Sequence, residues 1–175
     1  MALLALAAVT GSALGAQSAT KARQSNGRSA LAYYGGEISR FERETWHWQR
    51  VMGVGLTPRN ERTLSGLPAT AVQQAAETWR HRLAQAYAAA QHPPHLREFL
   101  CIHRFEGSWT DTGSPYYGGL QMDLSFQQSY GGWLYRRKGT ADHWSPLEQI
   151  WTAEKALRSR GFWPWPNTAR FCGLL

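Results

Sequence analysis

Two stretches of this sequence repeat apolar residues at alternating intervals of three and four, which is the period of one face of a helix. They cover residues 38–52 and residues 72–90. Glycines and a proline follow the first stretch, and a pair of prolines follows the second, so both helices have a defined end. The pattern therefore predicts a helical hairpin over residues 37–92.

The sequence after residue 92 changes character and predicts a second unit at residues 93–175. Short helical patterns alternate there with segments rich in glycine and proline. In chain order we expect a helix at 95–105, a turn or short β-hairpin at 107–122, a helix at 123–130, a loop at 131–140, a helix from Ser145 to Gly161 that opens with a capping box, and an irregular tail at 162–175. The expected fold class is α+β and mostly α.

The N-terminal segment has the composition of an export signal. Residues 2–16 are apolar or small, and the run is shorter than the ~20 residues that span a membrane. No Lys or Arg precedes the run, so an Ala-rich helix is the alternative. We expect a signal peptide at residues 1–16, a flexible linker at residues 17–36, and an exported protein that is not inserted in the membrane once the leader is removed.

The net charge of the chain restricts its partners. A formal charge of +7 attracts polyanions such as nucleic acid, anionic lipid or acidic cell-wall polymers. The longest basic block is Arg136–Lys138, and the sequence lacks the spacing of a zinc finger or a helix-turn-helix. Nucleic acid is therefore not an expected partner. Hydrophobic residues make up 43% of the chain, which excludes wholesale disorder.

The cysteines are a single pair, Cys101 and Cys172. In an oxidising compartment an even pair is usually bridged. Such a bridge closes a loop of about 70 residues and contributes roughly 4 kcal/mol in the chain-entropy model. The alternative is two buried thiols in a cytosolic protein, so the disulfide and the export signal are expected together.

Glu106 is the candidate catalytic residue. It follows the helix predicted at 95–105, where the negative end of the helix dipole disfavours its charged form. Phe105, Trp109 and a pair of tyrosines could remove water from it, with the same effect. A general acid requires a carboxyl that holds its proton. The alternative is a solvated glutamate that only ends a helix.

The residues after Glu106 fit a sugar-binding site. Two consecutive glycines leave backbone that a ligand can approach closely, a glutamine amide can both donate to and accept from an N-acetyl group, and aromatic faces suit sugar rings. The candidate substrate-binding residues are Gln121, Tyr117, Gly118, Gly119, Trp109 and Trp133. Core packing is the alternative for the three aromatic residues.

These motifs, in this order, resemble the transglycosylase-like domain of the resuscitation-promoting factors. The resemblance covers about residues 95–175 and rests on Cys101, Glu106, "YYGGLQ" at 116–121, "YGGW" at 130–133, "LEQI" at 147–150, and "GFWPWP" before Cys172. Family members commonly place the cysteine directly before the glutamate. Here "IHRF" intervenes, which moves Cys101 by about one helical turn.

The resemblance implies a small lysozyme-like domain that acts on peptidoglycan glycan strands. It implies that Glu106 is the general acid and base for cleavage of the β-1,4 bond between N-acetylmuramic acid and N-acetylglucosamine. We expect a lytic transglycosylase route, with muramidase-like hydrolysis as its rival, because a conventional glycosidase needs a second carboxylate. Asp111 and Asp123 are the nearby candidates, and each has a local explanation in a turn or a cap.

Three other interpretations compete with that of a peptidoglycan-cleaving enzyme. A catalytically silent peptidoglycan-binding module would keep the groove without turnover, and a basic nucleic-acid binder would show steep salt dependence. The third is a metal site at His103, which lies three residues before Glu106 and has other histidines nearby, but no zinc-binding spacing such as HExxH occurs. We expect neither a metal nor a cofactor.

Overall fold

The computed structural model describes residues 11–59, 64 and 66–175. The elements are α1 (Gly11–Met52), α2 (Ala69–Ala90), α3 (Leu96–Glu106), β1 (Tyr116–Tyr117), β2 (Met122–Asp123), α4 (Leu124–Lys138), the 3₁₀ helix η1 (Ala141–His143), α5 (Pro146–Arg160) and α6 (Pro166–Phe171). β1 and β2 pair antiparallel, with Tyr117 opposite Met122. The predicted class, α+β and mostly α with a short β-hairpin, is confirmed.

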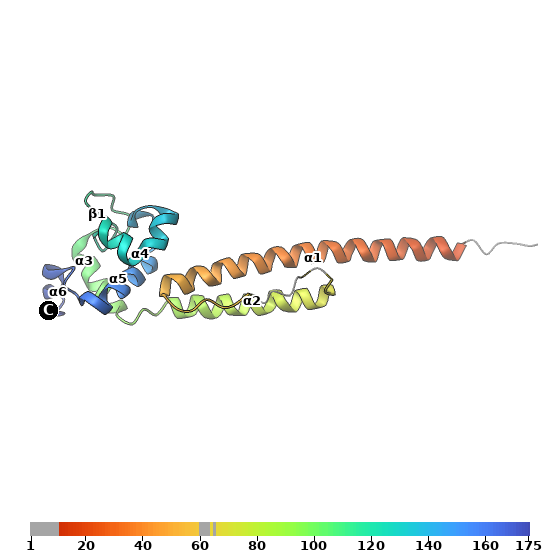
Figure 1. The fold of residues 1–175 in the computed structure, drawn as a ribbon, viewed down its shortest axis with the longest axis horizontal. Coiled ribbons are helices and arrows are strands. Elements are labelled where there is room, and N and C mark those ends of the chain that lie inside the picture. The colour runs from red at the N-terminus through yellow and green to blue at the C-terminus, as the bar shows by residue number, and fades with distance from the viewer. Residues whose placement is uncertain (1–10, 60–63, 65) are drawn as a thin grey trace, which may run out of the picture.

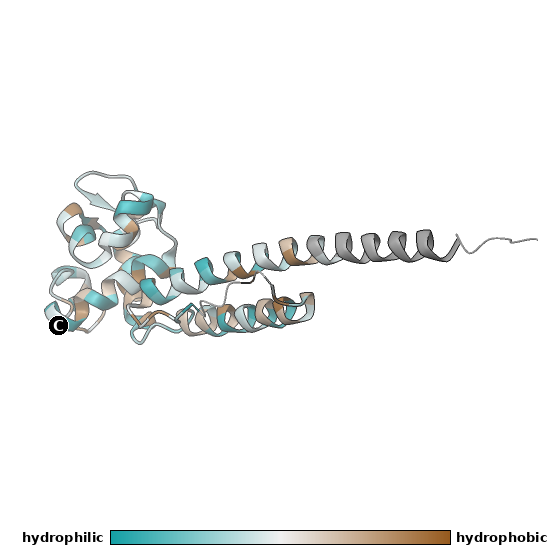
Figure 2. Cartoon of the chain, turned by 45° about the vertical axis from the view of Figure 1, so that its right-hand side comes forward, coloured by the Kyte–Doolittle hydropathy of each residue, from teal (hydrophilic) through white to brown (hydrophobic). Residues whose placement is uncertain are grey.

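α1 and α2 lie side by side and extend away from the globular C-terminal part (Figure 1). Their contact is the apolar face that the sequence spacing predicts, with a buried cluster of Ile38, Phe41, Val72, Ala76 and Trp79. Figure 2 shows apolar and hydrophilic residues alternating along α2 and the coloured C-terminal part of α1, as expected of amphipathic helices. None of the helices, over the described part of the chain, is both long enough and apolar enough to cross a membrane.

α1 begins earlier than the apolar spacing indicates. The segment 17–36, expected to be a flexible linker, lies within α1, which starts at Gly11. Alanine, glutamine, lysine and arginine are common there and favour a helix, and Leu31 and Tyr34 pack against the apolar cluster of the hairpin, so that part of the expectation is wrong. Residues 1–10 of the expected signal peptide lie outside the described residues, and the signal peptide stays a prediction.

The base of the hairpin is built into the main core of the C-terminal part. Val51, Met52 and Ala90 belong to the same buried cluster as residues of α3, α4 and α5. The indole nitrogen of Trp151 donates a hydrogen bond of 2.8 Å to the carbonyl of Ala90. The hairpin is therefore held by shared apolar packing as well as by the covalent link at residues 91–95. The division of the chain at residues 92 and 93 stays a prediction.

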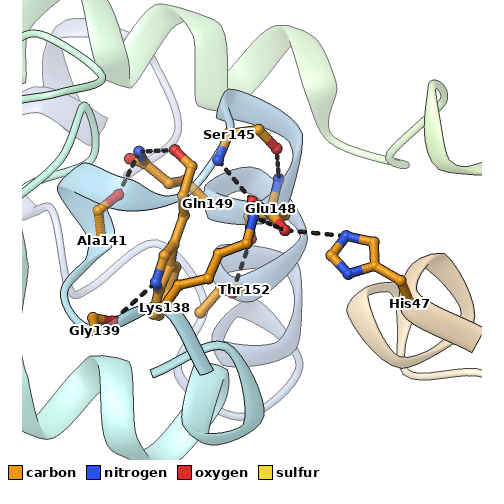
Figure 3. A network of polar contacts seen from close by, with 9 residues as sticks. His47, Lys138, Gly139, Ala141, Ser145, Glu148, Gln149 and Thr152 are labelled. Atoms are coloured by element: carbon orange, nitrogen blue, oxygen red, sulfur yellow. Dashed lines mark hydrogen bonds and ion pairs between the residues drawn. The ribbon is translucent and has the colours of Figure 1, made fainter. Parts of the chain in front are cut away.

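A buried carboxylate adds a polar link at the same junction (Figure 3). Glu148 on α5 is 1% exposed, and its Oε1 lies 3.0 Å from Nε2 of His47 on α1. Lys138 Nζ, at the end of α4, lies 2.7 and 2.8 Å from the two carboxylate oxygens. The Ser145 amide donates to Oε2 in the predicted capping box. Burial by itself would raise the pKa of Glu148, but hydrogen bonds from His47, Lys138 and Ser145 lower it from 4.5 to about 2.

Helix α4 continues through residues 131–138 of the segment 131–140, where a loop was expected. Asp123 caps α4 as predicted, because its side chain accepts from the Phe126 amide. The chain kinks at Gly131, where a Cβ would lie 2.5 Å from the ring of Trp144. Beyond the kink Leu134 is 2% exposed in the core. The burial of this apolar residue explains why a glycine-containing segment is helical.

The C-terminal tail contains a short helix where irregular structure was expected. α6 begins at Pro166, and proline fits the first helical position because the amide hydrogen it lacks has no partner there. Trp165 precedes α6 and is 4% exposed. Its indole nitrogen donates a 2.7 Å hydrogen bond to the Leu120 carbonyl in the β-hairpin turn. This bond fixes the start of α6 next to the turn.

Candidate active site

Glu106 is the last residue of α3 and lines an open cleft of about 390 Å³ together with residues 103–105 and 107–109. The residue is half-buried. Among the described residues that line this cleft, Glu106 is the one carboxylate. Its Oε1 accepts a hydrogen bond of 2.7 Å from the hydroxyl of Thr168 on α6. The candidate acid thus lies beside a cleft, with one of its oxygens held by the protein.

One wall of the cleft is an aromatic stack. The rings of His103 and Trp109 lie with centroids 3.9 Å apart and planes inclined by 22°. His103 Nδ1 lies 3.0 Å from the Gly119 carbonyl, which can only accept, so this nitrogen carries a hydrogen. Within the described ranges no group of three or more His, Cys, Asp or Glu side chains is placed to hold a metal ion. His103 here supports Trp109.

The glycines of the β-hairpin turn are required by packing inside the protein. A Cβ at Gly118 would lie 2.5 Å from Oε1 of Gln149, and the φ of Gly118 is +72°. A Cβ at Gly119 would lie 2.6 Å from both His103 Nδ1 and a ring carbon of Trp109. The turn therefore has a structural reason for both glycines. Close approach of a ligand to this backbone stays a prediction.

Gln149 is a residue of the site that the sequence did not reveal. It is fully buried on α5. Its Oε1 accepts from the Gly119 amide at 2.8 Å, and its Nε2 lies 2.8 Å from the carbonyls of Trp109 and Ala141 and 3.0 Å from that of Trp144. One side chain thus fixes the turn and the cleft loop onto α5. The sequence signal that pointed toward it is the "LEQI" motif, which contains this glutamine.

Gln121 lies next to the loop that follows Glu106, and its role in substrate binding stays a prediction. Its Nε2 donates to Asp111 Oδ2 at 2.8 Å and to the Gly118 carbonyl at 3.0 Å. If Gly107, the residue after Glu106, carried a Cβ, this atom would lie 3.2 Å from the same nitrogen, so the Gln121 amide packs closely against Gly107. The other oxygen of Asp111 accepts from the Gly113 amide at 3.0 Å. Both oxygens of Asp111 therefore shape the loop, in agreement with the turn explanation of this acid.

The structure separates the three predicted aromatic residues. Trp109 lines the cleft beside Glu106. Tyr117, in β1, is partly buried against the main core. Trp133, on α4, faces α1: its ring lies 5.4 Å from that of His47, and the guanidinium of Arg50 lies 5.5 Å from its centroid. Of the three residues, Trp109 is the one that the structure brings to Glu106.

The predicted disulfide is present and joins α3 to α6. Cys101 and Cys172 are bridged, with their Cα atoms 6.0 Å apart. One turn away from the disulfide, α3 carries Phe105 after Cys101, and α6 carries Thr168 before Cys172. Phe105 also meets Phe171, with ring centroids 5.7 Å apart. This cross-linked pair of helices holds Thr168 against Glu106, and Thr168 is the second site residue that the sequence did not reveal.

Comparisons with known proteins agree with the geometry. The family described as transglycosylase-like domain matches residues 106–168. The resuscitation-promoting factor RpfE of Mycobacterium tuberculosis (strain ATCC 25618 / H37Rv) is 40% identical over 65 residues, which are 37% of this chain and 35% of that protein. The chain thus spans about a third of the length of this relative.

Residues 106–168 are therefore similar to a transglycosylase-like domain, and the relative that shares 40% identity over 65 residues is a resuscitation-promoting factor. The matched segment of this domain begins at Glu106 and ends at Thr168, the two residues that share a hydrogen bond. The α1–α2 hairpin lies outside the matched segment, although its base belongs to the core that supports the domain.

Proposed function

We propose that the transglycosylase-like domain cleaves the β-1,4 bond between N-acetylmuramic acid and N-acetylglucosamine in peptidoglycan, with Glu106 as general acid and base. The observation that carries the proposal is the position of Glu106, a carboxylate in an open cleft at the start of the family match. Trp109 offers an aromatic face in the same cleft. Gln121 and the adjoining backbone would help to position the acetamido group.

A lytic route accounts for the surroundings of Glu106 better than hydrolysis does. A conventional glycosidase uses a second carboxylate about 5 Å away for retention, or about 6.5–9.5 Å away for inversion. Asp111 is engaged by Gln121 and Gly113. Asp123 caps α4, and hydrogen bonds from Ser125 and the Phe126 amide lower the pKa of Asp123. Both carboxylates therefore accept hydrogen bonds that shape the fold, and a catalytic role would break these bonds.

In the lytic route the substrate supplies its own nucleophile. Glu106 donates its proton to the bridging oxygen as the bond from that oxygen to C1 of N-acetylmuramic acid breaks. The 6-hydroxyl of the same sugar then attacks C1 and gives its proton to the Glu106 carboxylate. The product is a 1,6-anhydro sugar, no water is consumed, and Glu106 ends in the protonated form in which it began.

The place of action follows from the substrate. Peptidoglycan lies outside the cytoplasmic membrane, so the protein would be exported and associated with the cell wall. The Cys101–Cys172 disulfide fits an oxidising compartment. The net charge of +7 suits the acidic polymers of a cell wall.

The second candidate is a non-catalytic peptidoglycan-binding module, which the same cleft and basic charge would serve. Digestion of purified peptidoglycan by the wild type and by Glu106→Gln, with mass spectrometry of the fragments and a sedimentation assay for binding, separates the two. Anhydro ends released by the wild type and lost in the variant, with binding kept, support the proposal. Reducing ends would require hydrolysis, and binding without fragments from either protein would favour the module.

A further inference from the structure

Thr168 makes a contact with Glu106 that the sequence does not reveal. Thr168 is 8% exposed, and its Oγ1 lies 2.7 Å from Glu106 Oε1. The same hydroxyl lies 3.4 Å from the carbonyl of Trp165. A hydroxyl has one hydrogen to donate, and the shorter of the two distances directs it to Glu106.

α6 is anchored at both ends, so the place of this hydroxyl is well defined. The Trp165 indole holds the start of α6 to the Leu120 carbonyl, and the Cys101–Cys172 disulfide holds its end to α3. Thr168 lies four residues before Cys172, about one helical turn. The hydroxyl is therefore presented to Glu106 by a short helix that is held beside α3.

We propose that Thr168 is a positioning residue for Glu106, an inference that rests on the proposed function. Its hydroxyl occupies Oε1, so the transferable proton resides on Oε2, the oxygen that serves the glycosidic bond. The same contact restricts rotation of the carboxyl group between the donation of one proton and the acceptance of the next. Misplacement of a catalytic group by about 1 Å can reduce a rate by about a hundredfold.

The test compares two substitutions at position 168 with one matched control. Thr168→Val keeps the shape and removes the hydroxyl, and Thr168→Ser keeps the hydroxyl. The control is Thr152→Val: Thr152 is also buried, and its hydroxyl donates to the Glu148 carbonyl on α5, which is not part of the cleft. We expect Thr168→Val to lower kcat by about tenfold to a hundredfold with KM changed less than about twofold. Thr168→Ser should restore most of kcat, and Thr152→Val should leave kcat unchanged.

A second readout separates failure of this inference from failure of the proposed function. In crystal structures, Glu106 should keep one rotamer in the wild type and in Thr168→Ser, and adopt more than one in Thr168→Val. A folded Thr168→Val with wild-type kcat, or a Thr168→Ser as impaired as Thr168→Val, would overturn the inference. If peptidoglycan is not cleaved at all, the proposed function fails, and the rotamers alone decide whether Thr168 positions Glu106.

Discussion

Replacement of Glu148 by glutamine should remove much of the stability that the protein loses in acid. Glu148 is 1% exposed, and His47, Lys138 and the Ser145 amide surround its carboxylate. These contacts favour the charged form, which is why the pKa of Glu148 falls from 4.5 to about 2 in the folded protein. The charged carboxylate thus links α5 to α1 and to the end of α4 (Figure 3).

The size of the effect follows from that pKa. A tenfold change in proton affinity is worth about 1.4 kcal/mol, so a change from 4.5 to about 2 corresponds to about 3 kcal/mol. The folded-state pKa is depressed, so this stabilisation is present above about pH 4.5 and is lost as the pH falls through about 2. Glu148→Gln should therefore be about 3 kcal/mol less stable than the wild type at pH 7 and nearly equal to it at pH 2.

The assay is urea unfolding between pH 2 and pH 7 with the disulfide intact, followed by tryptophan fluorescence. Glu44→Gln is the matched control, because Glu44 lies on the same hairpin helix as His47 and is exposed. Its stability should follow that of the wild type at every pH. If the curves for Glu148→Gln and the wild type run parallel across the whole range, the charged carboxylate does not hold this junction together.

Two further predictions concern the turn and the hairpin. Gly119→Ala should destabilise the fold by about 1–3 kcal/mol and reduce activity, because the new Cβ would lie 2.6 Å from His103 and Trp109. In the control Gly132→Ala the nearest contact of the new Cβ is 3.5 Å, so the loss of stability should be small. Equal melting temperatures for the two variants would refute the packing argument. Removal of residues 1–92 should abolish the near-ultraviolet circular dichroism of the C-terminal part, because Val51, Met52 and Ala90 complete its core. A native-like spectrum of the fragment would show that the C-terminal part folds without the hairpin.

The sequence predicted the elements whose folding depends on local pattern. The apolar faces around Phe41 and Trp79, the cap at Asp123 and the capping box at Ser145 all appear in the structure. Each depends on residues within a few positions of one another, or on a repeat that one helix displays by itself. The helix over 17–36 was missed because its many small and polar residues and its three glycines resemble a linker, although Leu31 and Tyr34 continue the apolar face of the hairpin.

The sequence analysis named two residues that line the cleft, but not the residues that hold the cleft in place. Glu106 and Trp109 stand close together in the sequence and meet in one cleft. Gln149 could not be recognised, because its partners are main-chain groups of three separate segments. Thr168 lies 62 residues from Glu106, in a tail whose two prolines suggested irregular structure. The position of Trp133 depended on the hairpin, which lies outside the family match.

The rate of glycosidic bond cleavage in purified peptidoglycan tests the central claim most directly. We would compare the wild type with Glu106→Gln and with Glu98→Gln, which removes an acid from the opposite end of the same helix. Loss of a general acid costs about 10²–10⁴ in rate, so Glu106→Gln should lose at least a hundredfold while Glu98→Gln keeps the wild-type rate. A folded Glu106→Gln that cleaves as fast as the wild type would contradict the assignment of Glu106 as the catalytic acid.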